Sequence, residues 1–133
     1  MSVVYVDTSA LVKLVVVEAE TQPLRQWIGR LDGSVAFATS IVTRIELIRA
    51  TRRHSADAAS SAETVLAGTD LVLMSPDLVS DAAMLDPPGL RTLDAIHLAT
   101  ARRIGSSLSA FVAYDARLLD AASAAGLPVA SPH

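Results

Sequence analysis

The chain of 133 residues contains no cysteine, one tryptophan and one lysine, Lys13. The absence of cysteine excludes disulfide scaffolds, thiolate zinc sites and cysteine nucleophiles. Long apolar runs are also missing. The longest, from Ala110 to Tyr114, falls far short of the roughly 20 residues that a membrane-spanning helix needs. We therefore expect no membrane segment.

Aromatic residues make up only 4% of the chain, whereas hydrophobic residues make up 51%, which is enough to build a core. The length fits a single domain spanning residues 1–133. The net charge of −3 argues against a generic electrostatic nucleic-acid binder, which is typically strongly basic. No basic segment precedes Asp7, so we expect no signal peptide, and with the lack of cysteine this predicts a cytoplasmic protein.

Short apolar runs alternate with segments of helical periodicity along the whole chain. This alternation predicts a parallel sheet with right-handed crossovers, and hence a compact α/β/α sandwich with a short, mainly parallel sheet. Strands are expected over residues 3–6, 35–38, 71–74 and 110–114, with an edge strand over 128–130. A first helix is expected to follow a cap at Thr8 or Ser9 and to run to residue 15. Further helices are expected over 18–30, 40–54, 56–68, 76–86, 93–103 and 116–125.

Two carboxylates follow predicted strands directly. Asp7 comes after the strand over 3–6 and Asp115 after the strand over 110–114. Because the carboxyl ends of parallel strands meet at one edge of a sheet, both side chains are expected there. Aspartate at this position is also a common helix N-cap, and that interpretation stays open for each residue. Thr8 and Ser9 compete with Asp7 for the capping role.

Two more carboxylates, Glu46 and Asp94, lie within predicted helices. Glu46 is either part of a site or a solvated residue paired with neighbouring arginines along its helix. Asp94 is either part of a site or a first-turn acid that interacts with the helix dipole, with Thr92 as the cap.

These four acids belong to four separate elements, and a close cluster of ionised carboxylates needs a cation. Hard oxygen ligands favour Mg²⁺ or Mn²⁺ over zinc. Such ions activate water for attack on a phosphodiester. The sequence therefore indicates a metal-dependent hydrolytic site, provided that the four side chains converge.

Four stretches of the sequence resemble, in order, those of PIN-domain ribonucleases, particularly the VapC-type toxins of bacterial toxin–antitoxin pairs. The resemblance covers nearly the whole chain, and it is most specific in the first and third stretches. They are Val4-Tyr5-Val6-Asp7-Thr8-Ser9-Ala10-Leu11-Val12-Lys13-Leu14, Thr43-Arg44-Ile45-Glu46-Leu47, Leu93-Asp94-Ala95-Ile96-His97-Leu98-Ala99 and Phe111-Val112-Ala113-Tyr114-Asp115.

The resemblance implies that Asp7, Glu46, Asp94 and Asp115 bind Mg²⁺ or Mn²⁺ and carry endonucleolytic cleavage of RNA. It also implies a homodimer and a cognate antitoxin that inhibits the protein. One position departs from the family pattern. Ala113 stands where such proteins often carry threonine or serine, which removes a hydroxyl near the second metal position. A catalytically silent PIN-like protein that binds RNA or a partner is therefore the alternative.

The remaining polar residues allow two interpretations each. Arg49 and Arg53 lie on the same helix face as Glu46 and either guide RNA phosphates or form a solvated face. Thr8 and Ser9 are further candidates for substrate contact. His97 follows Asp94 by one turn and is interpreted as a hydrogen-bonded helix histidine rather than a catalytic base.

A phospho-accepting aspartate, as in receiver domains, also follows a first strand. That chemistry generally requires a downstream lysine, and the only lysine, Lys13, comes too early in the chain. We therefore disfavour this class.

Overall fold

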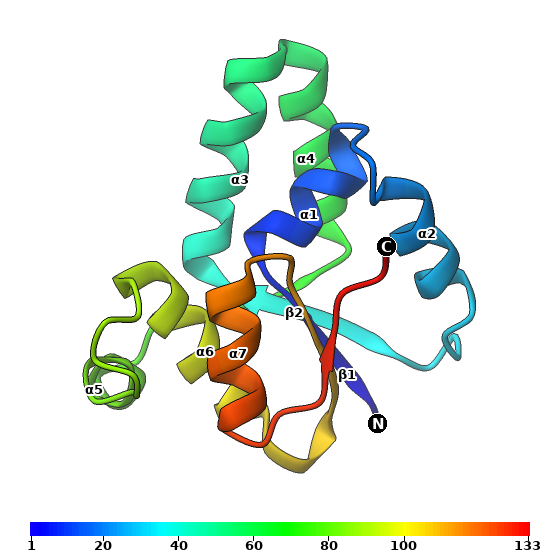
Figure 1. Cartoon of the computed structure of the whole chain (residues 1–133). Helices are drawn as coiled ribbons and strands as arrows, with labels where there is room; N and C mark the ends of the chain where they lie inside the picture. The colour runs from blue at the N-terminus through cyan, green and yellow to red at the C-terminus, as the bar shows by residue number, and fades with distance from the viewer.

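A central sheet of five parallel strands organises the computed structural model, which describes residues 1–133 (Figure 1). The strand order is β3-β2-β1-β4-β5, so β1 lies in the middle and β5 at an edge. All four pairings are parallel, as the alternating pattern predicts. The strands are β1 (Val3–Val6), β2 (Ala36–Ser40), β3 (Asp70–Val72), β4 (Leu108–Val112) and β5 (Val129–Ala130).

Helices cover both faces of the sheet, which gives three layers (Figure 1). Successive side chains of a strand point to opposite faces. Val4 and Val6 pack against α1–α4, whereas Tyr5 packs against α6 and α7. No helix has the length and apolar character needed to cross a bilayer. The helices are α1 (Thr8–Val15), α2 (Thr21–Gly29), α3 (Ile41–His54), α4 (Ala56–Ala67), α5 (Pro76–Ala83), α6 (Thr92–Ile104) and α7 (Ala116–Ala124), with a 3₁₀ turn at Gly105–Ser107.

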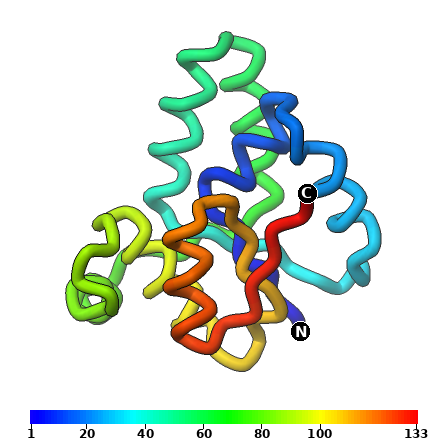
Figure 2. The backbone as a smooth tube through the Cα atoms, in the orientation of Figure 1, coloured from blue at the N-terminus to red at the C-terminus, as the bar shows by residue number.

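Helices α3 and α4 form an antiparallel pair that projects beyond the sheet (Figure 2). Ser55 separates them and caps α4, because its hydroxyl accepts the Ala58 N–H at 2.9 Å. The pair carries Glu46 near the sheet and Arg53 toward its far end. A continuous face of α3 therefore runs outward from the edge of the sheet at which the strands end.

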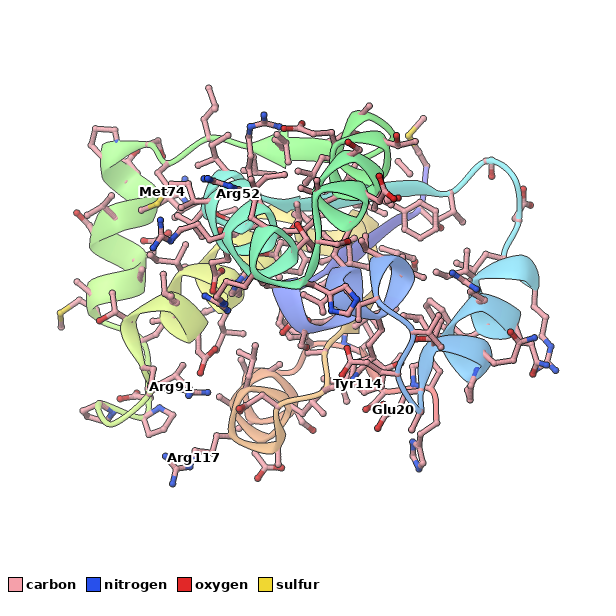
Figure 3. All side chains as sticks on the ribbon, turned by 90° about the horizontal axis from the view of Figure 1, so that it is seen from above. Glu20, Arg52, Met74, Arg91, Tyr114 and Arg117 are labelled. Carbon is pink, nitrogen blue, oxygen red and sulfur yellow. The ribbon has the colours of Figure 1, made fainter.

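The chain after β4 returns toward α1 through Tyr114 (Figure 3). The Tyr114 hydroxyl donates to the Pro132 carbonyl at 2.7 Å, and the Lys13 ammonium lies 4.6 Å from the centre of its ring. Burial and the nearby carboxylate of Glu20 raise the pKa of Tyr114 to about 12. The hydroxyl therefore stays protonated and keeps donating at neutral pH.

Several predicted boundaries differ from the structure. β4 ends at Val112, so Asp115 follows two intervening residues instead of ending the strand directly. Asp7 caps α1, which confirms one of its two interpretations, and Arg91 occupies the cap position of α6 in place of Thr92. The alternative caps, Thr8 or Ser9 and Thr92, place the helix starts one or two residues too late. In α1 the reason is that a carboxylate that ends a strand can also accept the first free helical N–H.

Candidate active site

Asp7 is a buried carboxylate with no cationic partner. It is 4% exposed, and its Oδ1 accepts hydrogen bonds from the Ser9 hydroxyl at 2.7 Å and the Ala10 N–H at 3.0 Å. Its Oδ2 has no hydrogen-bond partner in the protein, and no lysine or arginine pairs with it. Burial raises the pKa of Asp7, against the opposing effects of nearby His97 and of the Ser9 and Ala10 hydrogen bonds. Burial outweighs them, so the folded protein disfavours the ionised form of this carboxyl group.

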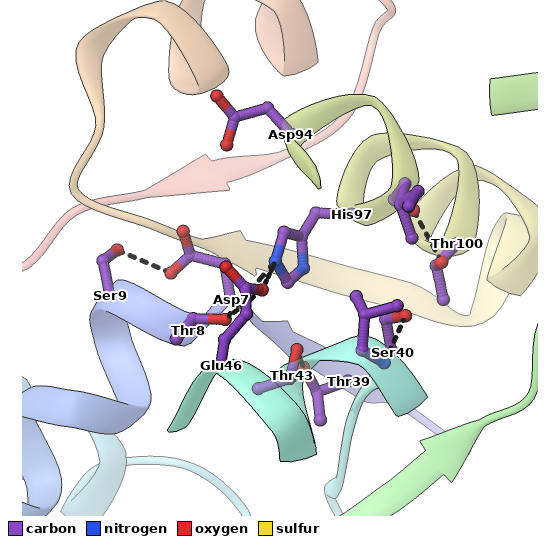
Figure 4. A network of polar contacts seen from close by, with 12 residues as sticks. Asp7, Thr8, Ser9, Thr39, Ser40, Thr43, Glu46, Asp94, His97 and Thr100 are labelled. Atoms are coloured by element: carbon purple, nitrogen blue, oxygen red, sulfur yellow. Dashed lines mark hydrogen bonds and ion pairs between the residues drawn. The ribbon is translucent and has the colours of Figure 1, made fainter. Parts of the chain in front are cut away.

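Glu46 lies beside Asp7 and is held through one oxygen (Figure 4). Its Oε1 accepts hydrogen bonds from the Thr8 hydroxyl at 2.8 Å and from His97 Nε2 at 3.0 Å, while Oε2 has no protein partner. Burial raises the pKa of Glu46, but the His97 and Thr8 hydrogen bonds outweigh it and lower the pKa overall. The prediction of arginine partners is wrong, because Arg44 instead forms a two-bond ion pair with Glu63 on α4.

His97 is hydrogen-bonded through both ring nitrogens. Nδ1 lies 2.6 Å from the Tyr5 hydroxyl, which also accepts the Ser40 N–H at 3.2 Å. Nε2 carries the proton that is donated to Glu46, because a carboxylate oxygen only accepts. His97 is therefore a 2% exposed histidine that orients Glu46, which confirms the expected hydrogen-bonded role.

Replacing Tyr5 by phenylalanine tests this chain of hydrogen bonds. Tyr5→Phe leaves the buried Ser40 N–H and His97 Nδ1 without their partner, and we expect a loss of about 1–3 kcal/mol in the free energy of unfolding. Urea unfolding measures it. If Tyr5→Phe unfolds at the wild-type urea concentration, these hydrogen bonds do not stabilise the fold as proposed.

Asp94 and Asp115 share one guanidinium. Arg91 donates from Nε to Asp94 Oδ2 at 3.1 Å and from a terminal nitrogen to Asp115 Oδ2 at 2.8 Å. The hydrogen bond to Asp94 and the charges of both acids raise the pKa of Arg91. Asp115 also caps α7, because its Oδ1 accepts the Leu118 N–H at 3.0 Å. Asp94 is a first-turn acid of α6, as one of its two interpretations stated, and its Oδ1 is free.

The four predicted carboxylates therefore fall into two groups at the same edge of the sheet. Asp7 and Glu46 lie together beside His97, whereas the Asp94 carboxylate is directed toward α7 (Figure 4). No group of three or more His, Asp or Glu side chains is arranged in position to hold a metal ion.

The donor chemistry nevertheless fits Mg²⁺ or Mn²⁺. Asp7, Glu46 and Asp94 each offer one carboxylate oxygen without a protein partner, and none of these oxygens is sealed from solvent. The buried charge of Asp7 in particular lacks the cation that such a group requires.

Arg49 and Arg53 line a groove that begins at this site. The groove has a volume of about 480 Å³, and neither arginine forms an ion pair. Exposed apolar side chains lie between the polar ones. The lining consists of Thr8, Val42, Ile45, Glu46, Arg49, Ala50, Arg53 and Leu93. The predicted common face of Glu46, Arg49 and Arg53 is therefore present.

The sequence alone does not indicate the roles of two polar residues at the site, Tyr5 and Arg91. Its pattern predicts Tyr5 only as a core residue of its strand. The signal for Arg91 was its position three residues before Asp94, the spacing of an ion pair across a first helical turn. Ala113 is fully buried and packs in the apolar cluster with Tyr5 and Phe111.

Comparisons with known proteins identify the family of the chain. A sequence profile described as the PIN domain matches residues 4–124. The chain therefore belongs to the PIN-domain family.

Within that family, its relatives are VapC ribonucleases. It is 40% identical to ribonuclease VapC47 of Mycobacterium tuberculosis over 97% of this chain and 96% of that protein. It is 42% identical to ribonuclease VapC35 of the same species, with the same coverage. Among solved structures, M. tuberculosis VapC20, described as a toxin that cleaves the sarcin–ricin loop, superposes with a TM-score of 0.76 at 22% identity, covering 97% of this chain and 99% of that one. A toxin–antitoxin complex from Klebsiella pneumoniae gives 0.71 at 20% identity, with 98% of each chain covered.

Proposed function

We propose that this chain is a Mg²⁺- or Mn²⁺-dependent endoribonuclease that acts as the toxin of a toxin–antitoxin pair. The observation that carries the proposal is the buried carboxylate of Asp7 at the carboxyl edge of a parallel sheet, next to Glu46, with its Oδ2 free of any protein partner. The ribonuclease names of relatives about 40% identical over nearly the whole chain support the RNA-cleaving activity.

The residues that would hold the cation are Asp7, Glu46, Asp94 and Asp115. A divalent cation there supplies activated water at neutral pH and stabilises the leaving oxygen of a phosphodiester. The chain provides the orientation. Ser9 fixes one oxygen of Asp7 and leaves the other available. Thr8 and His97 do the same for Glu46, whose free Oε2 either binds the cation or positions the attacking water.

The groove along α3 suits the RNA strand. Arg49 and Arg53 have no carboxylate partner, and arginine binds phosphate in a two-bond geometry. Thr8 lines the same groove next to Glu46, and Ser9 lies one residue further along α1. We propose Thr8, Ser9, Arg49 and Arg53 as substrate contacts.

An antitoxin partner belongs to the same proposal. Solved structures of similar fold include toxin–antitoxin complexes from Klebsiella pneumoniae and nontypeable Haemophilus influenzae. We propose that a cognate antitoxin covers the acidic edge and that the toxin forms a homodimer, as the family resemblance implies. Cytoplasmic RNA as the substrate makes the cytoplasm the expected location.

Metal removal combined with one matched pair of variants tests the activity. Antitoxin-free protein is incubated with cellular RNA in EDTA, and then with Mg²⁺ or Mn²⁺. We expect discrete products only with metal. Asp94→Asn is expected to lower cleavage by about 100-fold or more. Asp77→Asn is the control, because Asp77 is also a first-turn helix acid, in α5, and lies outside the site. Cleavage by Asp94→Asn at the wild-type rate, or in EDTA, contradicts the proposal.

A further inference from the structure

Arg91 is the only lysine or arginine that pairs with any of the four acids. Its side chain is 64% exposed and bridges Asp94 on α6 to Asp115 at the start of α7. Figure 3 shows Arg91 on the same side of the molecule as Arg117 of α7. The guanidinium thus supplies the positive charge that holds these two carboxylates together.

Both oxygens of Asp115 already accept a hydrogen bond. Its Oδ1 caps α7 through the Leu118 N–H, and its Oδ2 accepts the hydrogen bond from Arg91. A cation bound at Oδ2 would share that oxygen with the Arg91 guanidinium, and repulsion between the two positive charges would weaken the ion pair. Asp94 differs, because its Oδ1 is free. Arg91 and a divalent cation therefore compete mainly at Asp115.

Arg91 also borders a pocket into which its side chain can turn when it leaves the two carboxylates. A pocket of about 370 Å³ lies between the start of α6 and α7, with Arg91 and Arg117 on its wall. Arg117 forms no ion pair. The other residues that line this pocket are Pro87, Gly89, Leu90, Asp94, Asp120, Ala121 and Ala124. Two arginines beside an apolar surface suit a phosphate with its attached nucleoside.

We propose that Arg91 is a displaceable counter-cation, which pairs with Asp94 and Asp115 in the metal-free protein and turns to an RNA phosphate beside Arg117 when a divalent cation binds. The inference rests on the proposed metal-dependent function. It makes cation binding and RNA binding mutually supportive, because the cation frees the arginine that the phosphate uses.

The test measures Mn²⁺ affinity by electron paramagnetic resonance on EDTA-stripped protein without RNA. Arg91→Gln removes the competing charge but keeps a hydrogen-bonding side chain, and we expect it to bind Mn²⁺ about 3- to 30-fold more tightly than the wild type. Arg117→Gln removes a charge from the same pocket and is expected to change the affinity by less than about twofold. Arg91→Lys retains the charge and is expected to stay within about threefold of the wild type.

Two further readouts complete the test. Mn²⁺ is expected to raise the Tm of Arg91→Gln by more than it raises that of the wild type, since the ligand that binds more tightly stabilises more. At saturating Mn²⁺, the KM of Arg91→Gln for a cleaved RNA is expected to rise about three- to tenfold, with kcat within about twofold.

The possible outcomes distinguish a failure of the Arg91 inference from a failure of the proposed metal-dependent function. Unchanged or weaker Mn²⁺ binding by Arg91→Gln, or equal tightening in Arg117→Gln, overturns the competition. Tighter binding with an unchanged KM overturns the transfer to phosphate. A wild-type protein that binds no Mn²⁺ overturns the proposed function as well.

Discussion

Asp7→Asn is expected to abolish RNA cleavage, by about 1,000-fold or more, while making the metal-free protein more stable. The amide is nearly the same shape as the carboxylate and still caps α1, because its Oδ1 accepts the Ser9 and Ala10 hydrogen bonds. It carries no charge for a cation. Activity and stability therefore change in opposite directions at this residue.

The gain in stability follows from the desolvation of Asp7. Burial raises the pKa of this carboxyl group, which means that the folded protein disfavours its charged form at neutral pH. An amide avoids that cost, and we expect the free energy of unfolding in EDTA to rise by about 1–2 kcal/mol, or the Tm by roughly 2–6 °C. Added Mg²⁺ is expected to stabilise the wild type and to have little effect on Asp7→Asn.

Asp32→Asn provides the matched control for that experiment. Asp32 also accepts a backbone hydrogen bond, from the Ser34 N–H at 2.8 Å, but it is exposed and the hydrogen bonds from Ser34 lower its pKa. The same chemical change there is expected to give no increase in Tm and no loss of cleavage. An Asp7→Asn protein that melts below the wild type in EDTA, or that cleaves RNA normally, contradicts the assignment of Asp7.

Most of the fold could be predicted because its strands are short, apolar and separated by helices. The run Val3–Val6 is too short for a helix and is buried on both faces, which identifies a central parallel strand. The rule that parallel strands end at one edge then places Asp7 and Asp115 on the same side. The boundaries were less accurate, because β4 ends at Val112 and its last apolar neighbours, Ala113 and Tyr114, continue as a loop.

The partners of the site residues could not be predicted, since they depend on how distant elements pack. One of the two interpretations of Glu46 was pairing along its own helix, where arginines stand at suitable spacings. In the structure it faces inward, and the buried donors of Thr8 and His97 are 38 and 51 residues away in sequence. Tyr5 combines an apolar ring with a hydroxyl that reaches Ser40 and His97, and an aromatic residue in a strand gives no sign of such partners.

Reversing two charges on α3 is expected to weaken RNA binding strongly without removing any residue from the acidic edge. Arg49→Glu combined with Arg53→Glu replaces two unpaired cations in the groove beside Glu46 by anions. We expect kcat/KM to fall roughly 10- to 100-fold, mainly through KM. The negative slope of log affinity against log salt concentration is expected to become shallower by about 1.4, which is the contribution of two phosphate contacts on single-stranded RNA.

The control must distinguish a local effect of the groove on RNA binding from an effect of the net charge of the protein. Arg25→Glu combined with Arg30→Glu changes the net charge equally but at α2, and neither arginine lines the groove along α3. We expect this pair to alter KM by less than about threefold. If both double variants lose the same affinity, then RNA responds only to net charge, and the groove has no directing role. A loss confined to the α3 pair means that the RNA approaches the carboxylates along this helix.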